Sequence, residues 1–82
     1  MFTQYIYNVD GRKRSRFFQS WDHANSELIK EYKGLLERHP DAVTVYDYDY
    51  YNTSKGFPVR QIGLLIDGVS FTLSLIDCYF ED

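Results

Sequence analysis

The stretch VRQIGLLIDGVSFTLSLIDCYF, residues 59–80, is the strongest indication of the fold, because it holds two apolar, alternating runs around one tight turn. Asp67 and Gly68 form the turn, since an Asp-Gly pair readily takes the positive φ angles of a two-residue hairpin loop. With that loop, one face carries the facing pairs Ile66–Val69, Leu64–Phe71 and Ile62–Leu73. The reverse face carries small or polar residues, as on the solvated side of an antiparallel sheet: Gln61, Gly63, Ser70, Thr72 and Ser74. We expect the core to lie against the first face.

A second Asp-Gly turn, Asp10-Gly11, stands near the N-terminus between the runs FTQYIYN and KRSRFFQS. The same loop type predicts a hairpin with one apolar face, on which the facing pairs are Ile6–Ser15, Gln4–Phe17 and Phe2–Gln19. The other face pairs Tyr7 with Arg14 and Tyr5 with Arg16, within reach of cation–π contact. We expect this tyrosine–arginine face to be exposed.

The segment that follows predicts an amphipathic helix over residues 21–38. Ser20 suits the N-cap, and Asp22 lies in the first turn, where the helix dipole favours an anion. Pro40 ends the helix, because the residue before a proline is disfavoured in the α conformation. The apolar residues recur at steps of three and four, and we expect them to face the sheet: Trp21, Ala24, Leu28, Tyr32, Leu35 and Leu36.

The run VTVYDYDYYN, residues 43–52, alternates with the period of a strand. Val43 and Val45 are expected to face the helix. Asp47 and Asp49 would follow them, which requires a bulge or a strand that extends past the helix, because an unpaired buried carboxylate is costly. The open face of the sheet would then carry Tyr46, Tyr48 and Tyr50, beside Tyr5, Tyr7, Arg14 and Arg16.

Together these segments predict the order β-β-α-β-β-β. This is a single α+β domain over residues 1–82, with one helix packed on one face of a five-stranded antiparallel sheet. The order of the strands across the sheet does not follow from the sequence. No apolar run approaches the roughly 20 residues that span a bilayer, and the first residues lack a secretory signal pattern, so we expect a cytoplasmic protein.

Residues with catalytic or metal-binding chemistry are few and scattered. His23 and His39 stand at opposite ends of the predicted helix, about 24 Å apart and too far to share a metal. Cys78 is the only cysteine, and no nucleophile motif surrounds it or any serine. Asp47 and Asp49 could bridge a hydrated cation, but they match no calcium-binding loop. We expect no enzymatic activity, no metal and no cofactor.

Charge divides unevenly along the chain. Residues 1–38 hold seven Lys and Arg residues and five acidic residues, whereas residues 39–82 hold two Lys and Arg residues and seven acidic residues. The net charge of the whole chain is −3. This balance disfavours binding to nucleic-acid phosphates and favours a basic protein partner. Tyrosines are enriched at protein interfaces, and carboxylates accept the fork of an arginine. The expected partner-binding residues are Tyr46, Asp47, Tyr48, Asp49, Tyr50, Tyr51, Asp77, Glu81 and Asp82.

The run VYDYDYYN, the small size and the acidity of the chain resemble the small inhibitors that phages and mobile elements carry, anti-CRISPR proteins among them. The resemblance implies a non-enzymatic protein of the host cytoplasm, a nucleic-acid mimic that occupies the basic groove of a nucleic-acid-targeting complex such as a CRISPR effector. The resemblance does not assign a role to any individual residue. Two alternatives stay open: an accessory or structural interaction domain, and a domain that binds single-stranded nucleic acid through Tyr5, Tyr7, Arg14 and Arg16.

Overall fold

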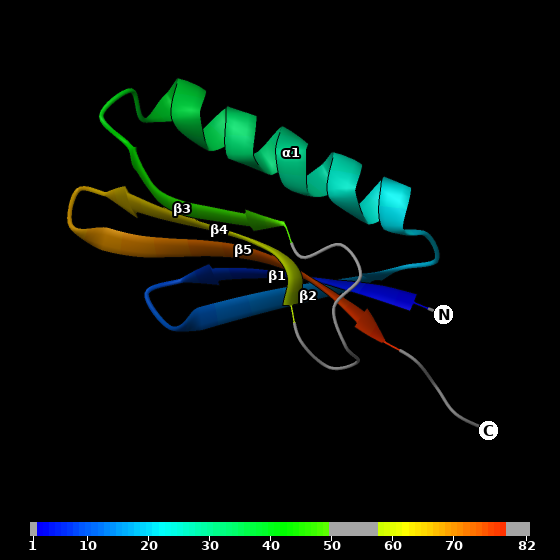
Figure 1. Cartoon of the computed structure of the whole chain (residues 1–82). Coiled ribbons are helices and arrows are strands. Elements are labelled where there is room, and N and C mark those ends of the chain that lie inside the picture. The colour runs from blue at the N-terminus through cyan, green and yellow to red at the C-terminus, as the bar shows by residue number, and fades with distance from the viewer. Residues whose placement is uncertain (1, 50–57, 79–82) are drawn as a thin grey trace.

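The computed structural model describes residues 2–49 and 58–78, which form a five-stranded antiparallel sheet with one helix on one face (Figure 1). Only the backbone is described for Phe2, Asp49, Pro58, Val59, Asp77 and Cys78. The elements are β1 (Phe2–Val9), β2 (Arg12–Phe18), α1 (Trp21–Arg38), β3 (Val43–Asp49), β4 (Pro58–Ile66) and β5 (Val69–Cys78). The predicted α+β fold and its element order are confirmed.

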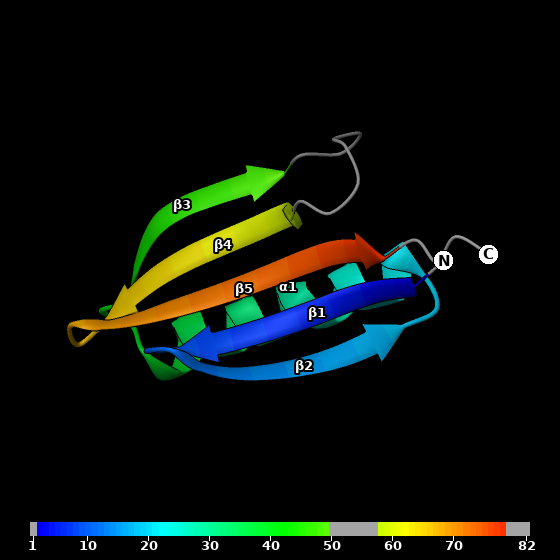
Figure 2. The same ribbon diagram turned by 90° about the horizontal axis from the view of Figure 1, so that it is seen from below.

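The strands lie in the order β2-β1-β5-β4-β3, so β1 and β5 join the two predicted hairpins side by side. α1 covers one face of the sheet, which we call the helix face. Figure 2 looks onto the opposite face, which no described element covers and which we call the open face. β5 has a strand on each side and contacts the helix, so it lies at the centre of the domain.

Both Asp-Gly turns form as predicted. Asp10 and Gly11 have φ angles of 51° and 88°, and Asp67 and Gly68 have 51° and 78°. Two successive positive φ angles are what a type I′ hairpin turn requires. The registers are also those predicted, with the pairs Ile6–Ser15 and Tyr7–Arg14 in the first hairpin and Leu64–Phe71 and Ile62–Leu73 in the second.

The helix has the predicted bounds and the predicted buried stripe. The Ser20 hydroxyl accepts a hydrogen bond of 3.2 Å from the His23 backbone N–H, which satisfies one of the unpaired donors of the first turn. Ala24, Leu28 and Leu35 are buried against the sheet. They meet the largest buried side chains of the second hairpin, which are Ile62, Leu64, Leu73 and Leu75. Within the part of the chain that the structure describes, no helix combines the length and apolarity that a membrane span needs.

The expected exposure of the tyrosine–arginine face is wrong. β1 pairs with β5 so that Tyr5 stands opposite Leu75 and Tyr7 opposite Leu73, which places both tyrosines on the helix face. Tyr5 is buried, whereas Phe17, on the face expected to be apolar and covered, is 61% exposed. Both faces of the first hairpin carry aromatic rings, and its pairing with the aliphatic strand β5 decides which face is buried.

The expectation that Val43 and Val45 face the helix is also wrong. Thr44 stands opposite Leu64 and Tyr46 opposite Gly63, so Val45 is the extra residue of a β-bulge. The bulge reverses the alternation, and both valines are more than half exposed. Thr44 takes the place on the helix face, where its hydroxyl forms a hydrogen bond of 2.8 Å with the Tyr32 hydroxyl.

Candidate functional site

Two stacked tyrosines stand on the open face of β3, where the alternation predicts them. The ring centroids of Tyr46 and Tyr48 lie 5.0 Å apart with an angle of 18° between the ring planes. The Tyr46 ring lies over Gly63 of β4, and its Cδ1 would stand 2.9 Å from a Cβ atom added to that glycine. The absence of a side chain at Gly63 therefore leaves room for the Tyr46 ring on the sheet. This ring stacks on the ring of Tyr48, which is 46% exposed.

Asp47 points to the other face of the same strand, the helix face. Its carboxylate Oδ2 lies 4.0 Å from Nη2 of Arg60, while Nη1 of Arg60 donates a hydrogen bond of 2.8 Å to the side-chain oxygen of Asn25. The Arg60 side chain is only 18% exposed, so the carboxylate helps to compensate a largely buried cation. This interaction explains why an aspartate is tolerated on the helix face of β3.

The structure therefore separates the residues that the sequence grouped as one binding surface. Tyr46 and Tyr48 lie together, but Asp47 lies on the opposite face from them. Asp49 ends β3, and Asp77 is in β5, which β4 separates from β3. The remaining predicted partner-binding residues, Tyr50, Tyr51, Glu81 and Asp82, lie outside the described residues.

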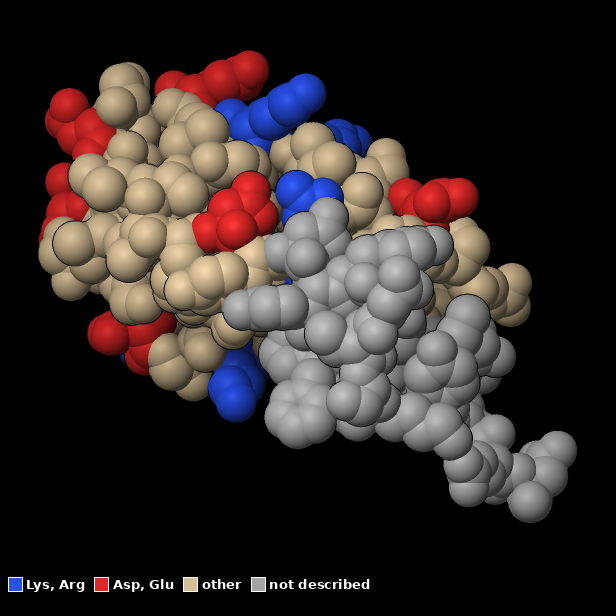
Figure 3. Space-filling view, in the orientation of Figure 1, with Lys and Arg blue, Asp and Glu red and all other residues tan. Residues whose placement is uncertain are grey.

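The open face is nearly uncharged, a property that the sequence analysis missed. Among the strand side chains that the structure describes, the registers place one charged residue on this face, Lys13. Large apolar side chains are exposed there, with Phe17 61%, Val43 57% and Leu65 44% exposed. The helix side differs, because acidic and basic side chains are interspersed over α1 in Figure 3.

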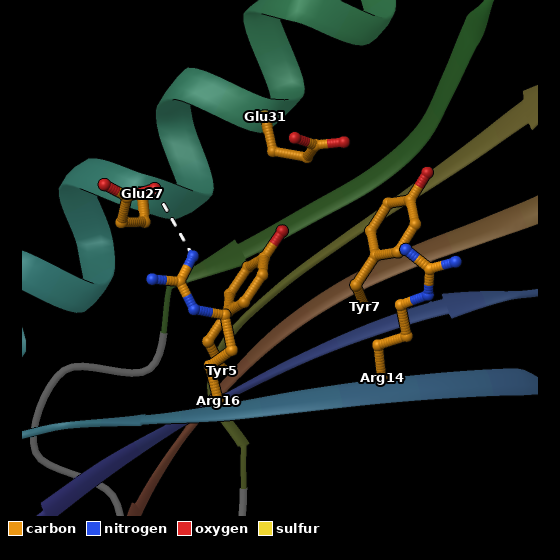
Figure 4. A pocket seen from close by; sticks show the side chains of 6 residues that line it. All are labelled: Tyr5, Tyr7, Arg14, Arg16, Glu27 and Glu31. Atoms are coloured by element: carbon orange, nitrogen blue, oxygen red, sulfur yellow. Dashed lines mark ion pairs between the residues drawn. The ribbon is translucent and has the colours of Figure 1, made fainter.

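A slot lies on the helix face between α1 and the first hairpin, with a volume of about 190 Å³ (Figure 4). Its six lining residues are Tyr5 and Tyr7 of β1, Arg14 and Arg16 of β2, and Glu27 and Glu31 of α1. The structure thus brings together the four residues of the predicted nucleic-acid face, but under the helix and beside two glutamates. A base cannot stack on the ring of Tyr5, which is 6% exposed.

Burial raises the pKa of the Tyr5 phenol, and the nearby Glu31 carboxylate raises it further. The Tyr7 pKa is raised by the same two causes in the same order. Sequence reasoning missed Glu27 and Glu31 as site residues. The sequence does contain a signal for these two glutamates: they are four residues apart, so they lie on the same side of the predicted helix, beside its apolar stripe.

Among the described residues, no group of three His, Cys, Asp or Glu side chains is placed to hold a metal ion. His23 instead packs edge-on against the Phe18 ring, with 4.9 Å between centroids, and the His39 backbone N–H caps the helix end by donating to the Leu35 carbonyl at 2.9 Å.

No protein-family model matches this chain, and no curated protein or solved structure is significantly similar to it. Its function is therefore inferred from the open face around Tyr46 and Tyr48 and from the slot between α1 and the first hairpin.

Proposed function

We propose that this protein is a non-enzymatic binding protein whose partner docks on the open face around Tyr46 and Tyr48. The observation that carries the proposal is the stacked tyrosine pair on a sheet face with one charged side chain among those described. The cores of protein interfaces are depleted of charge and enriched in tyrosine and phenylalanine. The solvated face of an antiparallel sheet, by contrast, ordinarily carries polar residues rather than exposed aromatic and aliphatic side chains.

Three exposed aspartates at one end of this face outnumber the two neighbouring cations, Arg12 and Lys13, and favour a partner with a basic rim. Asp10 and Asp67 are exposed in the two hairpin turns, which lie side by side because the Asp10 N–H donates to the Ser70 carbonyl at 2.9 Å. Asp41 is exposed just before β3, whose first residue pairs with Leu65 near the same end. Such charges set association rate and partner choice more than affinity.

We further propose that the partner is a nucleic-acid-targeting complex, such as a CRISPR effector. The protein docks in the nucleic-acid-binding groove of this complex and inhibits the complex. The net charge of −3, the stacked tyrosines and the exposed Asp10, Asp41 and Asp67 near one end of the open face support this proposal. A small acidic protein seated in a basic groove excludes nucleic acid, since both compete for the same cations.

The test measures binding to purified effector complexes and their cleavage of guide-matched DNA. We expect Tyr48→Ala to weaken binding at least about tenfold, as for an interface hot spot, with an equal loss of inhibition. Lys33→Ala, on the exposed side of α1, is the matched control and should bind like the wild type. Equal affinity of the two variants would contradict the docking surface.

The inhibitor proposal and the accessory-domain alternative predict different results in the same assay. An inhibitor in the groove is displaced by excess guide-matched DNA and blocks cleavage. An accessory domain would use the same open face, but it would bind together with the DNA and leave cleavage intact.

A further inference from the structure

The slot under α1 has a floor of tyrosines and two lips of opposite charge (Figure 4). Tyr5 and Tyr7 form the floor. Arg14 and Arg16 stand opposite them on the neighbouring edge strand β2 and form a cationic lip. Glu27 and Glu31, one helical turn apart, form an acidic lip on α1. The four charges sum to zero, and one pair, Arg16 and Glu27, forms a long ion pair across one end of the opening, whereas Arg14 and Glu31 do not pair with each other.

The Tyr5 hydroxyl lies in this slot without a hydrogen-bond partner among the described residues, although it is shielded from solvent. Tyr5 as a whole is 6% exposed, and Figure 4 shows its hydroxyl directed toward the helix between Glu27 and Glu31. Buried hydroxyl groups are nearly always hydrogen-bonded, so an unpaired one marks a place where a further polar atom is missing.

The charged lips also keep unused hydrogen-bonding capacity. Arg16 Nη1 lies 3.8 Å from Glu27 Oε2, and Glu31 Oε1 lies 3.6 Å from Nη2 of Arg38. Both distances exceed the roughly 2.7–2.9 Å of a charge-assisted hydrogen bond. Arg14 forms no ion pair with a residue that the structure describes. Each lip can therefore bind a charge of the opposite sign.

We propose that this slot binds a small zwitterion of the free α-amino acid class. Its carboxylate faces Arg14 and Arg16, its ammonium group faces Glu27 and Glu31, and the Tyr5 hydroxyl bonds to one of its polar atoms. A lone anion or a lone cation would satisfy one lip and be repelled by the other. Only a molecule that carries both charges matches both lips at once.

The size of the slot limits the ligand. Its volume of about 190 Å³ far exceeds the roughly 10–15 Å³ that a single water molecule needs. It is smaller than the roughly 300–1,000 Å³ of sites for drug-sized molecules. The ammonium group would also lie near the tyrosine rings of the floor, which attract cations.

The test compares three matched probes: L-alanine, propionate, which lacks its ammonium group, and ethylamine, which lacks its carboxylate. Each is titrated into the isotopically labelled protein at constant ionic strength, and backbone amide shifts are followed by NMR. We expect saturable shifts around the slot with L-alanine, and a Kd at least tenfold lower than for either half-molecule.

Two variants separate the proposed contacts. Tyr5→Phe keeps the ring and removes the hydroxyl, and it should weaken L-alanine binding at least fivefold without lowering the melting temperature. Arg14→Gln should abolish the preference for L-alanine over ethylamine. Arg12→Gln changes the same charge on the same strand but outside the slot, and it should bind like the wild type.

Three results would overturn the proposal. Absence of saturable shifts with L-alanine would mean that water alone fills the slot. Equal affinity for propionate or for ethylamine would mean that the slot holds a simple ion. An unchanged preference for L-alanine in Arg14→Gln would place the binding elsewhere.

Discussion

Tyr5 combines a ring that belongs to the core with a hydroxyl that has no hydrogen-bond partner among the described residues. The ring packs with Leu75 across the strand pair, whereas the hydroxyl is held away from water. A buried, unpaired hydroxyl costs about 1–3 kcal/mol. We therefore expect Tyr5→Phe to leave the free energy of unfolding unchanged or to raise it by up to about 1 kcal/mol, measured by urea titration at pH 7. A loss of 2 kcal/mol or more would show that the hydroxyl is bonded in solution.

The same residue predicts how stability changes at alkaline pH. Burial, reinforced by Glu31, raises the pKa of Tyr5 above its ordinary value of 10.0. Below pH 10 the phenol is protonated in both folded and unfolded chains. Above it the unfolded chain releases a proton that the folded chain keeps, so stability falls as pH rises. We expect unfolding free energies measured from pH 8 to 11.5 to decline less steeply for Tyr5→Phe than for the wild type. Parallel declines would contradict the raised pKa.

At the scale of elements, the packing of β3 on β4 depends on a missing side chain. A Cβ atom at Gly63 would collide with the Tyr46 ring, so Gly63→Ala should destabilise the domain by about 1–3 kcal/mol, as overpacking does. Tyr46→Ala should relieve the clash. We expect a double-mutant cycle, measured by chemical denaturation, to give a coupling energy of at least about 1 kcal/mol. Additive effects would mean that the ring does not lie over the glycine.

The start of α1 depends on one capping hydroxyl. Ser20→Ala removes the acceptor for the His23 N–H and should lower the free energy of unfolding by about 0.5–2 kcal/mol. Ser26→Ala makes the same change at an exposed position inside the helix, where alanine is the better helix former, and it should be neutral or slightly stabilising. Equal effects of the two substitutions in thermal denaturation would exclude a capping role for Ser20.

At the scale of the whole molecule, the strand order predicts a gradient of local stability. β5 is paired on both sides and covered by the helix, whereas β2 and β3 lie at the edges of the sheet. Opening the centre requires breaking more interactions than opening an edge. We expect amide hydrogen exchange, followed by NMR, to be slowest in β5 and faster in β2 and β3. Exchange in β3 as slow as in β5 would show that the edge is covered in solution, as self-association would do.

Short stretches of the sequence specify the elements and their local pairing. The ends of α1 follow from Ser20 and Pro40, and both hairpin registers follow from an Asp-Gly pair. These features depend on residues a few positions apart, so the chemistry that decides them is visible in short stretches. The outward position of Tyr46 and Tyr48 agrees with the prediction from alternation, but it depends on the bulge at Val45, because strict alternation from the exposed Val43 would turn Tyr46 to the helix face.

Long-range packing, in contrast, selects which faces are buried and which charged groups meet. The first hairpin carries aromatic rings on both faces, and its pairing with β5 selected Tyr5 and Tyr7 for the helix face. The bulge at Val45 reversed β3, which left the valines exposed and placed Asp47 beside Arg60. The opposed lips of the slot come from β2 and α1, and no local pattern says where a helix will cross a sheet. That crossing depends on the sum of many weak apolar contacts across the whole core, which exists only once the strands have assembled.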